Sequence, residues 1–323
     1  MNRRLFFQLS LVVLAPPLRL HAQSARKPAR IGVLSSTSPE TRSTFWEVFK
    51  DGMAKRGWIE GRDVTYVYRY ARGDSSRFDL LATELVAEKP DVIFASTQSA
   101  ALAVKRATRE IPIVFANVNE PVETGLVASL ARPGGNATGL TGATVETRTK
   151  TLELLREIVP KLRRIAVLVS PGELGKQDLR GIEIAARALH VEVDAMVVAN
   201  PDELRKALQS LGAKRPDGVL LLVTGVVTRG EVAKRMTELR LPGIYFISEM
   251  VTAGGLISYG VDLSDNFRRA AEYVDRILKG TKPGDLPVQQ PTVFHLAVNL
   301  KTARAQGLTI PQSVLLRATT VIE

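Results

Sequence analysis

Residues 29–36 read ARIGVLSS and residues 163–170 read RRIAVLVS, so one short pattern opens two parts of the chain. Each stretch is apolar and rich in β-branched residues, which is typical of a strand buried on both faces of a sheet. A helical pattern follows each stretch, at 40–57 and at 173–189. Strands that alternate with helices indicate a parallel sheet covered on both faces. The sequence therefore predicts an α/β fold with two copies of one doubly wound unit.

The likeness between the two parts continues beyond their first strands. The stretch KPDVIFAS at 89–96 matches RPDGVLLLV at 215–223, and IPIVFAN at 111–117 matches LPGIYFIS at 241–248. A chain of 323 residues is long enough to hold two domains. We therefore predict two doubly wound parallel-sheet lobes that follow each other along the chain.

Three extended connectors belong to neither copy, and we interpret them as a hinge through which the chain crosses between the lobes three times. These hinge segments lie at about 135–146, 253–262 and 286–298. The predicted lobe 1 comprises residues 29–138 plus 262–290, and the predicted lobe 2 comprises residues 142–255 plus 292–323. Glycines in the first connector suit a segment whose dihedral angles change during motion. We expect Asn136 and Thr138 to lie near the floor of the cleft.

Candidate ligand-binding residues follow the predicted strands. Ligands of doubly wound sheets collect outside the carboxyl ends of the strands, and two facing lobes would line one cleft with both sets of ends. The candidates in lobe 1 are Ser35, Ser36, Thr37, Ser96, Thr97, Gln98, Asn119, Glu120 and Thr138. Those in lobe 2 are Ser170, Gly172, Thr224, Phe246, Glu249 and Tyr259. The set is rich in hydroxyl and amide groups and poor in bases.

These residue types suggest hinged closure on a small polar or zwitterionic ligand, with an amino acid as one candidate. We expect hydroxyl groups and the free amides of helix starts to hold a ligand carboxylate. The hydroxyl groups are those of Ser36, Thr37 and Thr97. Glu120 or Glu249 would pair with a ligand amine, because a buried charge needs a partner. Phe246 and Tyr259 would stack on an apolar part of the ligand.

Composition and motif spacing argue against other classes of protein. The net charge is +11, but the basic residues are spread among acids without a dense block, so we expect no nucleic-acid partner. The chain has no cysteine, which excludes disulfides and thiolate metal sites. The stretch SPGELGK at 170–176 lacks phosphate-loop spacing, and no HExxH or GxSxG motif is present. We therefore expect no metal, no cofactor and no catalytic residues.

The N-terminus has the layout of a secretory signal peptide. Arg3 and Arg4 precede an apolar run at 5–18, and small residues follow at 22–25. We assign residues 1–25 to this signal and expect a periplasmic protein. The arginine pair fits a twin-arginine export signal and an ordinary secretory signal equally well.

Long stretches resemble the bacterial ABC transporter substrate-binding proteins of the tryptophan/tyrosine-binding type, which have the type I periplasmic-binding-protein fold. The matching stretches are GWIEGRDV at 57–64, the segments 111–141, 253–262 and 268–311, and the ending RATTVIE. The resemblance implies three lobe crossings, a small-molecule ligand enclosed between the lobes, and delivery to an ABC permease with its ATPase. Such families often carry Asp where this chain has Glu120.

The resemblance leaves the ligand and the exact role open. We expect a monomer that serves an importer. A periplasmic sensor component that binds a ligand and signals through a receptor is one alternative. An enzyme on the same scaffold is another, because a fold does not fix a function.

Overall fold

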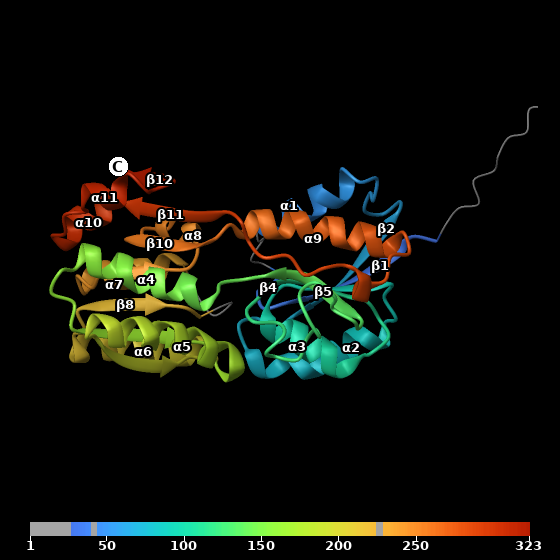
Figure 1. Ribbon diagram of the computed structural model, residues 1–323, viewed down its shortest axis with the longest axis horizontal. Coiled ribbons are helices and arrows are strands. Elements are labelled where there is room, and N and C mark those ends of the chain that lie inside the picture. Colours follow the sequence, from blue (N-terminus) through green and yellow to red (C-terminus); the bar gives the residue numbers. More distant parts are fainter. Residues whose placement is uncertain (1–26, 40–43, 224–228) are drawn as a thin grey trace, which may run out of the picture.

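The structure is a computed structural model that describes residues 27–39, 44–223 and 229–323. It consists of two α/β lobes that lie side by side along the longest axis of the molecule (Figure 1). The predicted signal peptide and Thr224 lie outside the described residues. Among the described helices, none has the length and apolar character that crossing a membrane requires.

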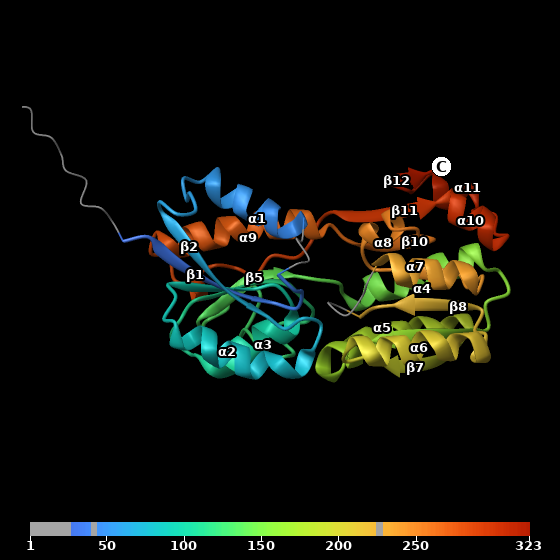
Figure 2. The same ribbon diagram turned by 180° about the vertical axis from the view of Figure 1, so that it is seen from behind.

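Lobe 1 is built on a five-stranded parallel sheet of order β2-β1-β3-β4-β5. The strands are β1 (Ala29–Ser35), β2 (Val64–Tyr70), β3 (Val92–Ala95), β4 (Ile113–Val118) and β5 (Ala137–Thr141). Helices α1 (Thr44–Ala54) and α9 (Leu263–Leu278) cover one face, and α2 (Phe78–Ala87) and α3 (Gln98–Ala107) cover the other (Figures 1 and 2). Two short 3-10 turns, Ser75–Arg77 and Pro283–Asp285, complete the lobe.

Lobe 2 is built on a seven-stranded sheet of order β12-β11-β10-β9-β8-β6-β7. The strands are β6 (Arg164–Val169), β7 (Glu192–Val197), β8 (Gly218–Leu221), β9 (Gly243–Tyr245), β10 (Ile257–Val261), β11 (Phe294–Asn299) and β12 (Thr320–Ile322). The order β7-β6-β8-β9-β10 repeats that of lobe 1, which agrees with the two similar halves of the sequence. One pair, β10 with β11, is antiparallel. The chain leaves lobe 2 after β10 and returns beside that strand in the opposite direction.

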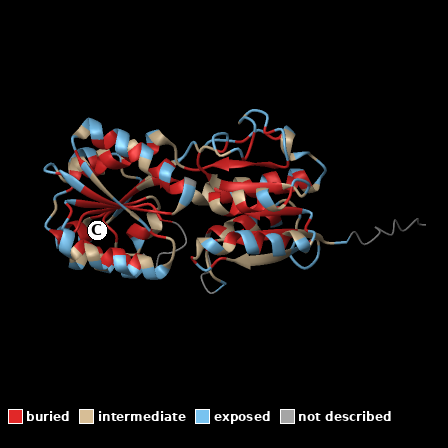
Figure 3. Ribbon diagram, turned by 90° about the horizontal axis from the view of Figure 1, so that it is seen from below, coloured by how far each residue is buried: buried red, intermediate tan, exposed pale blue. Residues whose placement is uncertain are grey.

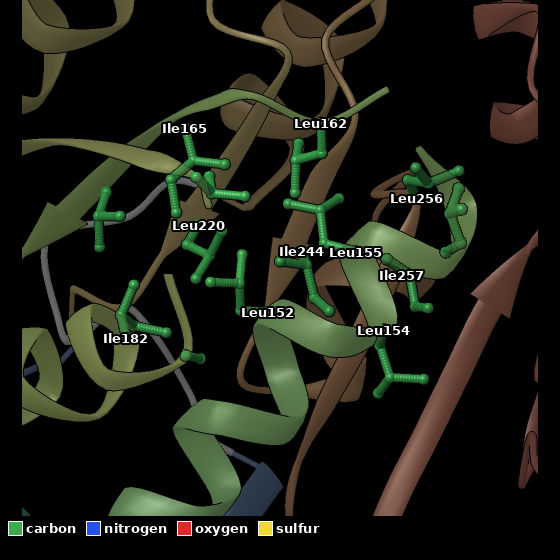
Figure 4. Packing of buried hydrophobic residues seen from close by; sticks show 14 of the residues in the cluster. Leu152, Leu154, Leu155, Leu162, Ile165, Ile182, Leu220, Ile244, Leu256 and Ile257 are labelled. Carbon is green, nitrogen blue, oxygen red and sulfur yellow. The ribbon is translucent and has the colours of Figure 1, made fainter. Parts of the chain in front are cut away.

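Seven helices belong to lobe 2 within the described residues. They are α4 (Val145–Ile158), α5 (Gly172–Leu189), α6 (Pro201–Lys214), α7 (Arg229–Glu238), α8 (Ser248–Thr252), α10 (Leu300–Gln306) and α11 (Gln312–Leu315). Leu152 and Leu155 of α4 pack against Ile165, Leu220 and Ile244 of the strands (Figure 4). Helices α6 and α7 pack on the opposite face. The central strands of both lobes are buried, as Figure 3 shows, whereas the edge strands β2, β7 and β12 are partly exposed.

The chain crosses between the lobes at three places, and the crossing segments bond to one another. It passes from β5 to α4, from β10 to α9, and from the turn at Pro283–Asp285 to β11 (Figure 1). The third crossing lies between the other two, because Thr141 N donates to Gln289 O at 2.9 Å and Asp262 N donates to Val293 O at 3.2 Å. Much of the connector predicted at 135–146 belongs to lobe 1, where residues 137–141 form an edge strand of the sheet.

Candidate ligand-binding site

A cavity of about 570 Å³ lies between the lobes, at the carboxyl ends of strands from both sheets. This volume falls within the range of small-molecule sites in proteins. Eight of the predicted site residues line it, and they are Ser35, Ser36, Thr37, Ser96, Thr97, Gln98, Asn119 and Phe246. Strand-end reasoning therefore places about half of the predicted residues around one space.

The segment that follows β1 supplies a group of hydroxyls to the cavity. Ser35 Oγ and Thr37 Oγ1 are 3.0 Å apart, and the Thr37 backbone N–H donates to Ser35 Oγ at 3.3 Å. Ser36 is buried between them. Hydroxyls both donate and accept, so this group can bind either a carboxylate or an amine.

The start of α3 lies at the same space, because Ser96, Thr97 and Gln98 all line the cavity. Thr97 is the N-cap residue, and its Oγ1 accepts from the Ala100 N–H at 3.3 Å. Ser96 Oγ donates to Leu34 O at 3.3 Å, which holds the preceding turn against β1. The first amides of a helix and its dipole favour a negative group. This end of lobe 1 therefore suits a ligand carboxylate.

The two lobes touch beside the cavity through α5. Gln98 Nε2 donates to Gln177 Oε1 at 2.9 Å, and the Asn119 N–H donates to Gln98 Oε1 at 2.8 Å. At the surface, Arg180 of lobe 2 pairs with Glu123 of lobe 1 at 2.7 Å. The side chain of Gln98 is thus engaged in contacts between the lobes.

A buried ion pair lines the lobe 2 side of the cavity. Arg148 Nε donates to Asp178 Oδ1 at 2.7 Å, and their side chains are 7% and 2% exposed. Asn119 Nδ2 approaches the same oxygen at 3.4 Å. Burial raises the pKa of Asp178, and the Arg148 guanidinium opposes that rise. Neither charged residue was among the sequence candidates.

Asp178 carries a signal that sequence reasoning could have used. It lies between Leu174 and Ile182 at helical spacing, in the buried stripe of α5. A carboxylate inside an apolar stripe is rarely placed there without a partner. The identity of that partner, on a different helix, is not readable from spacing.

Aromatic side chains form much of the lobe 1 wall of the cavity. Trp46 stacks on Phe49 with ring centres 4.8 Å apart, and its Nε1 donates to Tyr68 Oη at 2.9 Å. Tyr68 stacks on Tyr70 at 5.6 Å. Burial raises the pKa of Tyr68, although bonds from Trp46 and Lys50 oppose the rise. Tyr68 therefore stays a neutral hydroxyl at neutral pH.

These aromatic residues were missed because they belong to patterns typical of a core. Trp46 lies on α1 beside Phe45 and Phe49, which face the core of lobe 1, and Tyr68 lies on a strand with alternating aromatics. Phe246 of lobe 2, which was predicted, lines the cavity together with them. The cavity thus has aromatic rings from both lobes.

Three residues of lobe 1 that the sequence analysis placed at the cleft lie outside this cavity. Thr138 is fully buried in β5, where its Oγ1 donates to Leu286 O at 2.6 Å, so it is part of the packing of lobe 1. Asn136 directly precedes β5, at the amino end of the strand, where Lys105 donates to its Oδ1. The expectation that both lie near the cleft floor is wrong. Glu120 lies outside too, in a turn with φ of 45° whose carbonyl accepts from the Thr124 N–H.

Four predicted residues of lobe 2 also lie outside it. Ser170 and Gly172 are at the turn into α5 and do not line the cavity. Tyr259 stacks on Phe294 at 6.0 Å, beside the crossing segments. Glu249 lines a smaller adjoining cavity of about 160 Å³ with Asp262 and His295. In the part of the chain that the structure describes, no three His, Cys, Asp or Glu side chains are grouped for a metal ion.

Residues 30–322 match a family described as ABC transporter substrate binding protein. A tyrosine-binding protein of Clostridioides difficile (strain R20291) is 28% identical over 286 residues, which are 87% of this chain and 81% of that protein. This relative is similar over most of both chains.

Two solved structures extend the comparison. An ABC domain from Streptococcus pneumonia in complex with L-Trp is 27% identical, with a TM-score of 0.82 over 91% of this chain and 100% of that chain. A ligand-free, open structure of a substrate binding protein with adhesive properties from Clostridium difficile is 25% identical. Its TM-score is 0.61 over 91% of this chain and 99% of that chain. With its two type I lobes and a family match over nearly all described residues, the chain belongs to the ABC transporter substrate binding protein family.

Proposed function

We propose that this chain is the extracytoplasmic solute-binding component of an ABC importer and that it closes its two lobes on an aromatic amino acid. The observation that carries the proposal is one interlobe cavity in which aromatic rings and charged or hydroxyl groups line the same space. An aromatic amino acid has both kinds of group on one small molecule. We therefore expect the ligand to be a small zwitterion that carries an aromatic ring.

The aromatic wall supports a ring-bearing ligand. Trp46 and Tyr68 are held against each other by the bond from Nε1 to Oη, so their orientation is set before a ligand enters. Phe246 approaches from the other lobe. Aromatic rings gain stacking energy with one another beyond the area that they bury. A ring placed between the lobes would contact both.

The polar end of the cavity supports a carboxylate on the same ligand. The hydroxyls of Ser35 and Thr37 lie beside the start of α3, where Thr97 caps the helix. Two relatives point the same way, since one is named a tyrosine-binding protein and the other was solved with L-Trp.

The arrangement of the lobes supports a closing mechanism. The TM-score is higher with the complex that contains L-Trp than with the ligand-free, open structure, although the sequence identities are similar. The buried bond between Gln98 and Gln177 joins the lobes in this arrangement. Both observations favour a closed form here and an open form that admits the ligand, with the three crossings as hinge.

The remaining parts of the proposal follow from the family and the N-terminus. A substrate-binding protein of an ABC system presents its ligand to a permease coupled to an ATPase. The basic, apolar and small-residue pattern of residues 1–25 supports export before that encounter. We propose that the exported chain acts as a monomer.

The ligand class is tested by calorimetry on the exported chain after bound ligand has been removed by unfolding and refolding. L-Trp, L-Tyr and L-Phe are compared with L-Leu, L-Ser and D-galactose. We expect an aromatic amino acid to bind most tightly, and at 100 times its Kd to add about 2.7 kcal/mol to the free energy of unfolding. Tighter binding of L-Ser or D-galactose would overturn the ligand class.

The importer role needs a separate test in cells. Uptake of the labelled ligand is measured in the native host with and without the chain. Loss of uptake without the chain is expected. Unchanged uptake, together with a lost transcriptional response to the ligand, would favour the sensor alternative instead.

A further inference from the structure

The Arg148–Asp178 pair is the most deeply buried ion pair among the described residues, and it is incompletely bonded. The side chains are 7% and 2% exposed, whereas the other ion pairs within those residues each have at least one partner that is far more accessible. In the described part of the chain, Nε is the one guanidinium nitrogen of Arg148 that donates a hydrogen bond. Buried groups left without a partner cost free energy.

The unused bonding capacity lies on both members of the pair. Nη1 of Arg148 is fully buried and has no acceptor among the described residues. Both contacts of Asp178, from Arg148 and from Asn119, end on Oδ1. A pair that served packing alone would be expected to have these positions filled, since buried polar groups in proteins are nearly always bonded.

The pair faces the same cavity and lies close to the polar end of lobe 1. Arg148 and Asp178 both line the cavity. Gln177, the neighbour of Asp178, is bonded to Gln98, the first residue of α3. The charged pair of lobe 2 is thus brought beside the helix start of lobe 1 when the lobes meet.

We propose that Arg148 and Asp178 form a clamp for the head group of the ligand, with Arg148 next to a carboxylate and Asp178 next to an ammonium group. The inference rests on the proposed function, because it names the residues that recognise the zwitterion. The start of α3 would share the carboxylate from the other lobe. Asp178 then pairs with the ligand amine, which is the role that the sequence analysis predicted for Glu120 or Glu249.

Charge balance favours a zwitterion over a plain acid or a plain amine. The pair is neutral overall, so a neutral ligand with two opposite charges adds no net charge to a buried site. A plain carboxylic acid would bring an uncompensated negative charge beside Asp178, and a plain amine would bring a positive charge beside Arg148. Both are costly in a site removed from water.

The experiment compares each amino acid with the two molecules that lack one of its charges. One series is L-Trp, tryptamine and indolepropionate, and the other is L-Leu, isoamylamine and isocaproate. Calorimetry gives the preference of the wild-type chain for the amino acid within each series. Asp178→Asn should lower the preference for the amino acid over the acid that lacks the ammonium group by about tenfold to a hundredfold. Arg148→Gln should lower the preference for the amino acid over the amine that lacks the carboxylate by a similar factor.

Matched controls come from a second Arg–Asp pair in lobe 2. Arg205 and Asp202 pair on the exposed surface of α6 at 2.5 Å and do not line the cavity. Arg205→Gln and Asp202→Asn should keep the wild-type preferences. If the single cavity variants fold poorly, Arg148→Met with Asp178→Leu removes both charges together and should retain the fold. That double variant should still bind rings and lose the preference for the amino acid.

The outcomes separate this inference from the proposed function. If the aliphatic series binds more tightly than the aromatic one, the ligand class is wrong while the clamp is judged within the aliphatic series. If the wild type prefers the amino acid and the Asp178 and Arg148 variants keep that preference, the clamp is wrong and the ligand class stands. If the wild type prefers neither amino acid over the matching acid or the matching amine, the clamp and the ligand class are both overturned.

Discussion

Gln98 in lobe 1 donates a hydrogen bond to Gln177 in lobe 2, across 2.9 Å and out of contact with water. The same Gln98 accepts from the backbone N–H of Asn119, so its orientation is set within lobe 1. Gln177 Nε2 is buried and has no acceptor among the described residues. A buried bond between lobes exists only while they are together, so in the proposed closing mechanism this contact belongs to the closed form.

Gln177→Ala should weaken ligand binding without touching the ligand. The substitution leaves Gln98 Nε2 unpaired in the closed form and unaffected in the open form. We expect the affinity to fall by about threefold to tenfold, mostly through faster dissociation. Stopped-flow measurement of the tryptophan fluorescence of the chain, with L-Tyr as the ligand, gives the rate. Gln209→Ala on the exposed face of α6 is the matched control. An unchanged dissociation rate would show that the bond does not stabilise closure.

Trp46→Ala should reduce the affinity for aromatic ligands more than that for aliphatic ones. The substitution removes the ring that is bonded to Tyr68 and stacked on Phe49. We expect a loss of about tenfold or more for L-Trp. Trp46→Phe keeps a ring but loses the Nε1 donor. Its affinity for L-Trp should therefore lie between that of the wild type and that of Trp46→Ala. Calorimetry with L-Trp and L-Leu checks the difference, and an equal loss for both ligands would argue against stacking.

The parts predicted from sequence are those set by local pattern. Apolar β-branched runs alternate with helical patterns, so the two sheets and the strand-end hydroxyls of Ser36 and Thr97 follow from the order of elements. The antiparallel pair β10 with β11 depends on where the returning chain docks, which local pattern does not encode. The order of elements thus positions half of the site, and tertiary docking positions the rest.

The residues missed are those whose role depends on a distant partner. Trp46 has the helical spacing of a core residue, and only the position of α1 beside the cleft exposes it to the cavity. Arg148 and Asp178 are 30 positions apart on two helices. Thr138 was misplaced because the edge strand β5 carries it into the lobe, where Leu286 binds it.

Binding of an amino acid should release protons when Asp178 is partly protonated. Burial raises the pKa of Asp178 in the ligand-free chain, and a ligand ammonium would stabilise the charged carboxylate and lower that pKa. The affinity should therefore rise as the pH rises through the ligand-free pKa, and fall below it. Calorimetry in buffers with different ionisation enthalpies counts the released protons. Asp178→Asn should abolish the release, and a release that persists in this variant would assign it to another group.

Gly139→Ala should destabilise the chain, because β5 needs a glycine at this position. Gly139 has φ of +152°, and an added Cβ would lie 2.0 Å from Phe115 O in the neighbouring strand. The three atoms nearest to that Cβ all belong to the backbone of Phe115 in a buried strand, so they cannot move aside cheaply. We expect a loss of about 2 kcal/mol or more in the free energy of unfolding.

Gly230→Ala on α7 is the control, because nothing lies within 4 Å of its added Cβ. That control should stay within about 0.5 kcal/mol of the wild type, because Gly230 is exposed in the first turn of the helix. Urea unfolding of both variants checks the pair, and a Gly139→Ala chain as stable as wild type would contradict the close approach of β5 to β4.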